Sequence, residues 1–437
     1  MVKGNLNSLK DRVRGNQDAR ALVENFASLS ILKALGFVLP LITLPYLSRV
    51  IGVSRFGDIA FASSITVYFM TITDYGFNYT ATRDLSKNRD NMQYVRELFW
   101  NVFYTKLFLL VVSTVIFAIL VETIPLLQDH RLLLWFTYLS VPSYMLFPEW
   151  FFQGIEKMKY ITIVNVISRV LFTVLVFSVI KKETDFIYHP ILQSLGLLAA
   201  GVISLIIIIR KYKVYPIRFS WVTVKKTLVS GWDVFLSLIA PNLYSSSSTI
   251  FLQSFHGGVA SGLFSSGRKF ADIADQFSLL LSRVFFPFLA RRPEKHYLFR
   301  WITFIVQALS IVILLLGADL IISIFYTEEF RSSASVLRIM SLSLIFTYLT
   351  NVYSTNYLLL HGLERVNRRI VIYSSVFGLI VSYIFAKKWS YIGAALTFLT
   401  IRGAIGITTW IVARRNIRNK KEVLLNKSTS NTQVLNK

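Results

Sequence analysis

Long apolar runs recur along the whole of this 437-residue chain, and an ordinary soluble domain could not bury them all. Hydrophobic residues make up 54% of the sequence and charged residues only 16%, against about 25% charged in a typical globular protein. A bilayer core about 30 Å thick takes about 20 helical residues per crossing, which is close to the length of each run. The sequence therefore predicts an all-α, polytopic membrane protein without a large soluble catalytic domain.

The lengths of the apolar runs predict about twelve transmembrane helices. They lie at residues 28–49, 58–80, 98–120, 132–154, 162–180, 189–209, 232–255, 263–289, 301–323, 334–360, 370–386 and 391–412. Two of them are unusual, because 232–255 contains four consecutive serines and 263–289 contains several charges.

The basic residues of the loops predict the orientation of these helices. One set of alternate loops holds only Arg49, Arg55, Arg131, Lys181, Lys182, Arg331, Lys387 and Lys388, and the other set holds all the remaining loop lysines and arginines. The positive-inside rule places both termini and the richer set of loops in the cytoplasm, with an even number of spans. The tryptophans agree, because all except Trp221 lie near a predicted span end, where an interfacial indole belongs.

The sequence lacks the motifs of several kinds of catalytic and metal-binding site. The chain has no cysteine, its five histidines are scattered without a metal-ligand spacing, and it contains no phosphate-binding loop. The net charge of +24 does not indicate nucleic-acid binding, because no basic soluble domain carries it. We therefore expect a transporter rather than an enzyme, with no metal and no cofactor, and coupling to a proton or sodium gradient is left open.

Two short motifs recur at nearly the same spacing and indicate an internal repeat. Residues 153–158 (QGIEKM) resemble residues 361–366 (HGLERV), and each segment follows the end of a predicted span. Gly52 and Gly57 precede a span in the same way as Gly257 and Gly262. Two motifs at one spacing favour two six-helix bundles of the same orientation, although chance similarity between glycine-containing turns is the alternative.

This repeat divides the chain into five segments. They are a cytoplasmic N-terminal segment (1–27), a first six-helix bundle (28–210), a cytoplasmic linker (211–230), a second bundle (231–412) and a basic cytoplasmic tail (413–437). We expect the tail to be disordered because it is polar and charged.

Three segments of the first half resemble Wzx-type O-antigen flippases. They are residues 39–57, which include LPYLSRVIG and FG, residues 74–85, which include DYGFN and ATRDL, and residues 153–158. The similarity extends over roughly residues 20–412, but Arg268-Lys269 departs from the usual pattern. The resemblance implies a fold of the multidrug/oligosaccharidyl-lipid/polysaccharide (MOP) exporter superfamily, with two bundles that meet in a V.

The resemblance also implies a function and a set of partners. Such a protein moves an undecaprenyl-pyrophosphate-linked oligosaccharide from the cytoplasmic to the periplasmic leaflet by alternating access. It resides in membrane lipid and works in one pathway with a polymerase and a chain-length protein, and it binds no nucleic acid.

Charged and polar residues inside the predicted spans are the candidate substrate-binding residues. A charge at the bilayer centre is costly, so these side chains should face a cavity or one another. The candidates are Lys33, Asp74, Lys106, Glu149, Arg169, Asn242, Arg268, Lys269, Asp272, Arg283, Arg338 and Arg402.

The eighth span carries the densest set of these charges. Its polar residues, Arg268, Asp272, Asp275, Gln276 and Arg283, fall within about a third of the helix circumference. This spacing favours a wet face that lines a cavity and binds pyrophosphate. The alternative is that Arg268 and Asp272, one turn apart, only neutralise each other.

Two other functions compete with a flippase. A cation-coupled multidrug exporter of the same fold would favour a net acidic cavity, whereas the charges inside these spans are marginally basic. A polysaccharide polymerase or ligase resembles proteins with a long periplasmic loop, and the predicted outer loops are all short.

Overall fold

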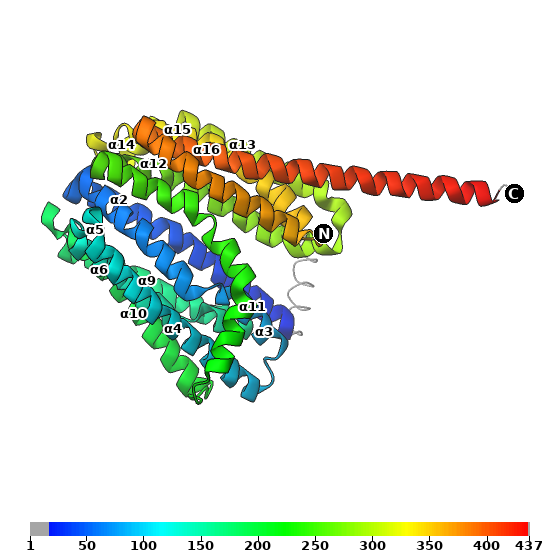
Figure 1. Ribbon diagram of the computed structural model, residues 1–437, viewed down its shortest axis with the longest axis horizontal. Coiled ribbons are helices and arrows are strands. Elements are labelled where there is room, and N and C mark those ends of the chain that lie inside the picture. Colours follow the sequence, from blue (N-terminus) through cyan, green and yellow to red (C-terminus); the bar gives the residue numbers. More distant parts are fainter. Residues whose placement is uncertain (1–16, 436–437) are drawn as a thin grey trace, which may run out of the picture. The chain divides into compact units, whose positions relative to one another are not determined.

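The computed structural model describes the backbone of residues 17–435 and most side chains of residues 36–419. The side chains at 37, 38, 40, 283, 284, 287, 288, 290, 291 and 293 lie outside the described residues. Between residues 17 and 435 the chain is helical or irregular and contains no strand (Figure 1). It divides into two compact units, the first ending at Ile239 and the second beginning at Ala240.

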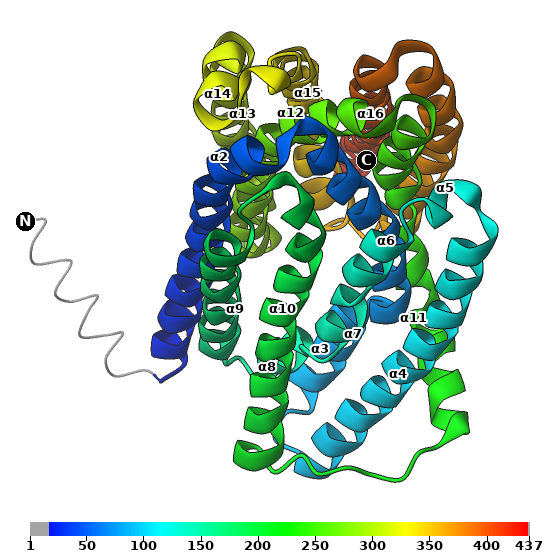
Figure 2. The same cartoon turned by 90° about the vertical axis from the view of Figure 1, so that its left-hand side faces the viewer.

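The first unit is built from twelve elements up to the end of α11. They are α2 (Gln17–Asp74), α3 (Phe77–Lys87), α4 (Met92–Thr123), α5 (Pro125–Gln128), α6 (Arg131–Tyr138), α7 (Ser140–Met145), α8 (Glu149–Gly154), α9 (Met158–Val179), the 3-10 helix η1 (Glu183–Tyr188), α10 (His189–Ile206) with its π-helical end η2 (Ile207–Lys211), and α11 (Trp221–Ile239). Helix α2 contains a kink at Gly52, and the chain changes direction at this kink (Figure 2). Phe99, Trp150 and Phe151 pack in the core of this unit, with ring centroids of Phe99 and Phe151 5.6 Å apart.

The second unit is built from longer helices. They are α12 (Asn242–Arg291), the 3-10 helix η3 (Pro293–Lys295), α13 (His296–Leu316), α14 (Ala318–Phe325), the 3-10 helix η4 (Glu328–Phe330), α15 (Ser333–Leu349) with its π-helical extension η5 (Thr350–Leu358), and α16 (Glu364–Leu435). Its core includes Phe264 and Phe398, both almost completely buried.

The surface of these helices is suited to lipid. Within the described residues, seven helical stretches are long and apolar enough to cross a membrane, and two of them contain a kink that divides them. On α4, Val111, Val115 and Ile119 form an exposed stripe with successive residues one turn apart. The predicted spans fall mostly on helical residues, although 132–154 is divided among α6, α7 and α8 and 232–255 between α11 and α12. The protein is thus a multi-pass integral membrane protein with an all-α fold, as predicted.

The glycine turns of the predicted repeat have the same backbone geometry in both units. Gly52 interrupts α2 with φ 69° and ψ 176°, and Gly257 interrupts α12 with φ 73° and ψ −170°. A positive φ combined with a ψ near 180° is essentially restricted to glycine, so glycine is required at each turn. The repeated spacing therefore reflects a repeated structural turn.

The second motif, residues 153–158 and 361–366, also corresponds to a turn that occurs in both units. The equivalent turn positions are Glu156 and Gly362, whereas the sequence similarity pairs Gly154 with Gly362, two residues away. A Schellman turn ends α8, where Glu156 N–H donates to Gln153 O and Lys157 N–H to Phe152 O. The equivalent turn in the second unit has Gly362 N–H donating to Leu359 O and Leu363 N–H to Leu358 O. The residue with positive φ is Glu156 in one turn and Gly362 in the other, whereas Gly154 lies within α8.

Two predicted boundaries differ from the structure. The first unit extends to Ile239 and includes α11, so the boundary lies after the predicted linker 211–230 and divides the predicted span 232–255. The tail predicted to be disordered instead continues α16 as far as Leu435 (Figure 1). Residues 232–255 are mostly apolar, so the sequence predicts one continuous span. The structure breaks this segment at Ala240-Pro241, where α11 ends, because proline cannot continue the hydrogen-bond ladder.

Candidate functional site: a polar centre in each unit

A buried ion pair joins α2 and α4 in the first unit. Asp74 is the last residue of α2, and its Oδ1 lies 2.7 Å from Nζ of Lys106 on α4. The side chain of Lys106 is only 4% exposed and that of Asp74 14% exposed. The helix ends here because Tyr75 and Gly76 both adopt positive φ, which leaves the carboxylate at a helix end inside the unit.

The pair continues into a hydrogen-bonded network. Asn78 Nδ2 donates to Asp74 Oδ2 at 3.3 Å and also lies 3.2 Å from the hydroxyl of Tyr144 on α7. The ring of Phe77 faces the Lys106 ammonium at 6.0 Å. Three helices and the start of α3 therefore contribute to one polar centre, as expected for charges that cannot reach water.

Glu149 and Arg169 belong to a second polar group of the first unit. Asn165 Nδ2 on α9 donates to Oε1 of Glu149, the first residue of α8, at 3.3 Å. Arg169 lies one turn further along α9 and interacts electrostatically with Glu149. Its guanidinium rests against Gly36 of α2, where an added Cβ would lie only 2.9 Å from Nη1.

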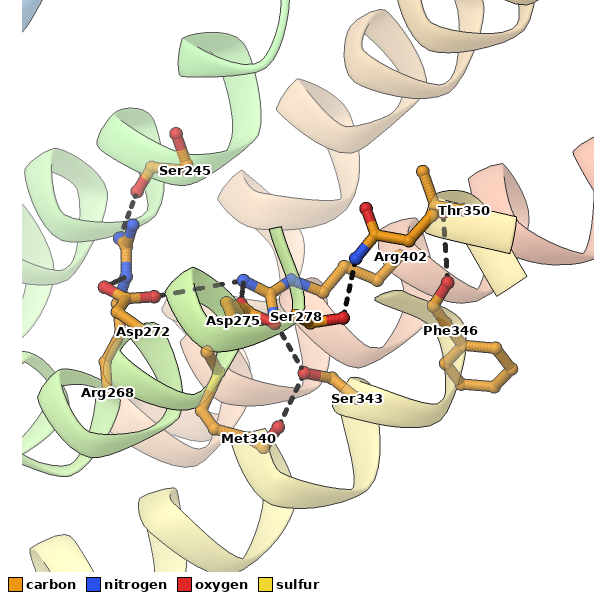
Figure 3. Close-up of polar contacts among 11 residues, drawn as sticks. Ser245, Arg268, Asp272, Asp275, Ser278, Met340, Ser343, Phe346, Thr350 and Arg402 are labelled. Atoms are coloured by element: carbon orange, nitrogen blue, oxygen red, sulfur yellow. Dashed lines mark hydrogen bonds and ion pairs between the residues drawn. The ribbon is translucent and has the colours of Figure 1, made fainter. Parts of the chain in front are cut away.

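Arg402 is the central cation of the second unit (Figure 3). Its Nη2 lies 2.6 Å from Oδ2 of Asp275 and 3.9 Å from Oδ1 of Asp272, both on α12. Its Nη1 donates to Ser343 Oγ on α15 at 3.1 Å. Arg402 therefore connects α16, α12 and α15 through charged and polar contacts.

Arg268 completes this cluster from the other side. Its Nε donates to Asp272 Oδ2 at 3.0 Å and its Nη1 donates to the Ser245 carbonyl oxygen at 3.2 Å (Figure 3). The ring of Phe398 lies under both guanidinium groups, with its centroid 4.5 Å from Cζ of Arg268 and 5.4 Å from Cζ of Arg402. Cation–π contacts of this kind stabilise partly desolvated guanidinium groups.

A row of buried amides lies beside this cluster. Asn351 Nδ2 donates to Ser278 Oγ at 2.7 Å, and Asn356 Nδ2 donates to Ser282 Oγ at 2.6 Å. Both asparagines lie in η5, where the wider π-helical turn brings polar side chains toward α12. These hydrogen bonds connect η5 to α12 through specific pairs of polar side chains.

Of the remaining candidates, Lys269 follows Arg268 in the chain and interacts electrostatically with Asp272 of the second unit's cluster. Lys269 is exposed, Asn242 begins α12, and Arg338 forms an exposed ion pair with Asp319 of α14. The side chains of Lys33 and Arg283 lie outside the described residues. Among the described side chains of residues 36–419, no group of three or more histidine or acidic residues is arranged to hold a metal ion.

The described charges are mostly paired. Every basic candidate with a described side chain forms an ion pair or interacts electrostatically with a carboxylate of its own unit. The cluster of the second unit balances two arginines against two aspartates. These guanidinium groups hold carboxylates through charge-assisted hydrogen bonds, a kind of contact that arginine also makes to phosphate oxygens.

Sequence reasoning missed several members of these centres. Tyr144, Ser343 and Phe398 carry no charge and lie on predicted spans whose other residues are mostly apolar, so only packing reveals them. Asn165 could have been found, because it lies one turn before Arg169 on the same helix face.

Full-length relatives include two proteins named "Putative O-antigen transporter". The one from Escherichia coli (strain K12) is 27% identical over 410 residues, which cover 92% of this chain and 99% of the relative. The one from Shigella dysenteriae is 23% identical and covers 86% and 96% of the two chains.

Solved structures share the fold at low sequence identity. "Lipid II flippase MurJ, inward closed conformation" has a TM-score of 0.67 at 15% identity, covering 90% of this chain and 87% of that one. An inward-facing multidrug resistance MATE family transporter of the MOP superfamily also has a TM-score of 0.67, at 16% identity, covering 91% and 99%.

A sequence profile agrees with these full-length similarities. It describes the polysaccharide biosynthesis protein family and matches residues 22–292, which is more than half of the chain. With its helical membrane fold and its buried charges, the chain belongs to the polysaccharide biosynthesis protein family.

Proposed function

We propose that this protein is a flippase for a lipid-linked polysaccharide precursor. In this proposal the substrate is an oligosaccharide on undecaprenyl pyrophosphate, moved from the cytoplasmic to the periplasmic leaflet of a bacterial inner membrane. The observation that carries the proposal is the match to an O-antigen transporter over 92% of this chain and 99% of that protein. The fold is also that of a lipid II flippase.

The buried ion pairs supply the physical means of moving such a headgroup. A pyrophosphate loses its hydration inside the membrane, and cations or hydrogen-bond donors must compensate for that loss. Arg268 and Arg402 already hold carboxylates at 3.0 Å and 2.6 Å, so a pyrophosphate oxygen can replace Asp272 or Asp275 without leaving a guanidinium unpaired. The serines and asparagines nearby offer hydrogen bonds to sugar hydroxyls.

We propose alternating access as the route. The protein opens to the cytoplasm to admit the glycan and then to the periplasm to release it, while the polyprenyl tail stays in lipid. No covalent step is required, and a polymerase and a chain-length protein then use the product. Coupling to a proton or sodium gradient is part of the proposal, with Asp74, Glu149 and Asp272 as candidate carboxylates.

A multidrug exporter is the second candidate. The observation that favours it is the TM-score of 0.67 to a multidrug resistance MATE family transporter, together with charge-balanced rather than cationic clusters. An exporter of cationic drugs would use the aspartates of these clusters as its binding groups.

A deletion strain tests the proposal. Without the protein, completed oligosaccharide units should accumulate on their lipid carrier at the cytoplasmic face, and surface polymer should be absent. Wild-type protein and the exposed-site control Arg331→Ala should restore the polymer, and Arg402→Ala should restore it poorly at equal abundance. Units found singly in the periplasm, or increased sensitivity to cationic drugs with normal polymer, would contradict the flippase.

A further inference from the structure

An irregular segment of the first unit is bound tightly to one face of α4. This segment, residues 212–220, is called the strap here, and it connects η2 to α11 across one end of the unit (Figure 2). Side chains of Arg96, Trp100 and Tyr104, each one turn apart, donate hydrogen bonds to its carbonyl groups. The bonds are Arg96 Nε to Tyr215 O (2.8 Å), Arg96 Nη2 to Pro216 O (2.8 Å), Trp100 Nε1 to Val214 O (3.2 Å) and Tyr104 OH to Ile217 O (2.7 Å).

Aromatic contacts extend the attachment of the strap. Phe219 packs edge-on against Tyr104 with ring centroids 5.6 Å apart, and Trp221 packs against Phe108 at 5.0 Å. The backbone of an irregular segment needs hydrogen-bond partners, and α4 supplies them from three residues on successive turns. The strap is therefore a preformed wall, so a ligand that binds beside it does not have to order it.

A pocket of about 790 Å³ lies between the strap and the first turns of α4. Four of its ten lining residues are basic and one is acidic. The lining consists of Met92, Gln93, Arg96, Glu97, Lys211, Tyr212, Lys213, Pro216, Ile217 and Arg218. Its volume suits a ligand of moderate size, and its charge suits an anion.

Two of the four cations are available to a ligand. Arg96 holds the strap, and Lys211 donates to the hydroxyl of Tyr160. The side chains of Lys213 and Arg218 are exposed and form no hydrogen bond or ion pair with other described residues, although the Lys213 carbonyl accepts a hydrogen bond from Tyr215 N–H. Lys213 has φ 55°, a left-handed conformation that costs free energy for any residue with a Cβ, and such strain concentrates at ligand sites.

The location of the pocket restricts the ligand. It lies at the ends of the candidate spans α10 and α4, beside loops that the positive-inside rule predicts to be cytoplasmic, and we therefore expect lipid headgroups at its depth. We propose that this pocket binds the phosphate headgroup of a membrane lipid through Lys213 and Arg218. Basic pockets at the cytoplasmic ends of transmembrane helices are suited to such headgroups.

Lipid phosphate at this depth has two sources. One is the phosphodiester of an anionic phospholipid, which would anchor the strap to the bilayer. The other is the pyrophosphate of a polyprenyl-linked saccharide, which would be captured before transport, and this source alone rests on the proposed function. Both place phosphate oxygens among cationic donors, and charge-assisted hydrogen bonds would hold them there.

Binding to the purified full-length protein tests the site. The protein is placed in nanodiscs of phosphatidylcholine, and the binding of phosphatidylglycerol and of undecaprenyl pyrophosphate is titrated separately. The double variant Lys213→Gln with Arg218→Gln should weaken at least one of them about tenfold or more, since each lost cation removes a charge-assisted contact. The matched control is Lys225→Gln with Lys226→Gln, which removes two exposed charges from α11 outside the pocket.

A glycine variant separates binding from folding. Lys213→Gly removes the cation and also relieves the positive φ, so it should keep or raise the melting temperature while it weakens binding. Loss of phosphatidylglycerol binding only would identify a bilayer lipid, and this result stands even if transport of the saccharide fails. Loss of pyrophosphate binding only would identify the substrate. Equal binding by wild type and the Lys213→Gln, Arg218→Gln variant, or equal losses in the control, would overturn the site.

Discussion

Arg402 Nη2 lies 2.6 Å from Asp275 Oδ2, and this contact joins α16 to α12 between residues far apart in the sequence. The side chains of the two residues are only 15% and 16% exposed. In so little water their attraction is weakly screened, and removing one partner leaves the other charge buried and uncompensated. The pair is therefore a strong structural constraint as well as a candidate anion site.

The first prediction concerns the stability of this pair. Arg402→Ala should destabilise the purified protein by about 3 kcal/mol, because Asp275 loses its nearest cation inside the unit. Adding Asp275→Ala should recover part of the loss, and Arg402→Lys should lose less than Arg402→Ala. Thermal unfolding in detergent measures all three variants. An Arg402→Ala protein as stable as wild type would show that the pair contributes nothing.

The second prediction separates substrate binding from charge pairing at Arg268. Arg268→Ala leaves Asp272 with a second cation, because Arg402 Nη2 is 3.9 Å from Asp272 Oδ1. We therefore expect a folded protein with sharply reduced transport, and we expect Arg268→Ala with Asp272→Ala to stay inactive. Surface polymer at equal membrane abundance measures transport. Full recovery in the double variant would reduce Arg268 to a partner of Asp272.

The helices and their repeat could be predicted from the sequence, because each depends on local pattern. Apolar runs of the length of a bilayer define a span, and Gly52 and Gly257 mark turns that require positive φ. The Arg268–Asp272 pair could also be predicted as an alternative, since its members lie one turn apart on one helix. For residues 413–437 the sequence predicts a disordered tail, whereas the structure continues α16 to Leu435, because composition alone does not decide whether a charged segment is helical.

The partners of the other charges could not be predicted from spacing. Lys106 has no acidic residue one turn away on α4, and its partner Asp74 comes from the end of α2. Arg402 finds Asp275 and Ser343 on two different helices. Which helix faces contact one another depends on the packing of whole units, and a linear pattern does not contain it.

The third prediction is a pH dependence at His130, which lies between α5 and α6. Its Nε2 is 3.5 Å from Asp58 Oδ1, and the hydrogen bond to this carboxylate raises the pKa of His130 above 6.5. A raised pKa stabilises the folded protein below pH 6.5, and this stability is lost as the pH rises through the raised pKa. The melting-temperature difference between wild type and His130→Gln should therefore be larger at pH 6 than at pH 9. A constant difference would exclude the charged pair.

The fourth prediction concerns topology. The chain has no cysteine, so single cysteines can be labelled without background. Cysteine in place of Arg331, whose side chain is 84% exposed, should react with an impermeant thiol reagent from the periplasm. Cysteine in place of the exposed Lys87 should react only after permeabilisation. Labelling of the Lys87 position in intact spheroplasts would reverse the predicted orientation.

Translocation in proteoliposomes tests the flippase most directly. Purified protein is reconstituted with a fluorescent undecaprenyl-pyrophosphate-linked oligosaccharide, and an impermeant quencher reports how fast the glycan crosses the bilayer. Wild type should accelerate crossing well above protein-free liposomes, Arg331→Ala should match it, and Arg402→Ala should be at least about tenfold slower, since a tenfold change needs only about 1.4 kcal/mol. Crossing no faster with wild-type protein than without it, alongside uptake of a cationic drug by the same vesicles, would contradict the account.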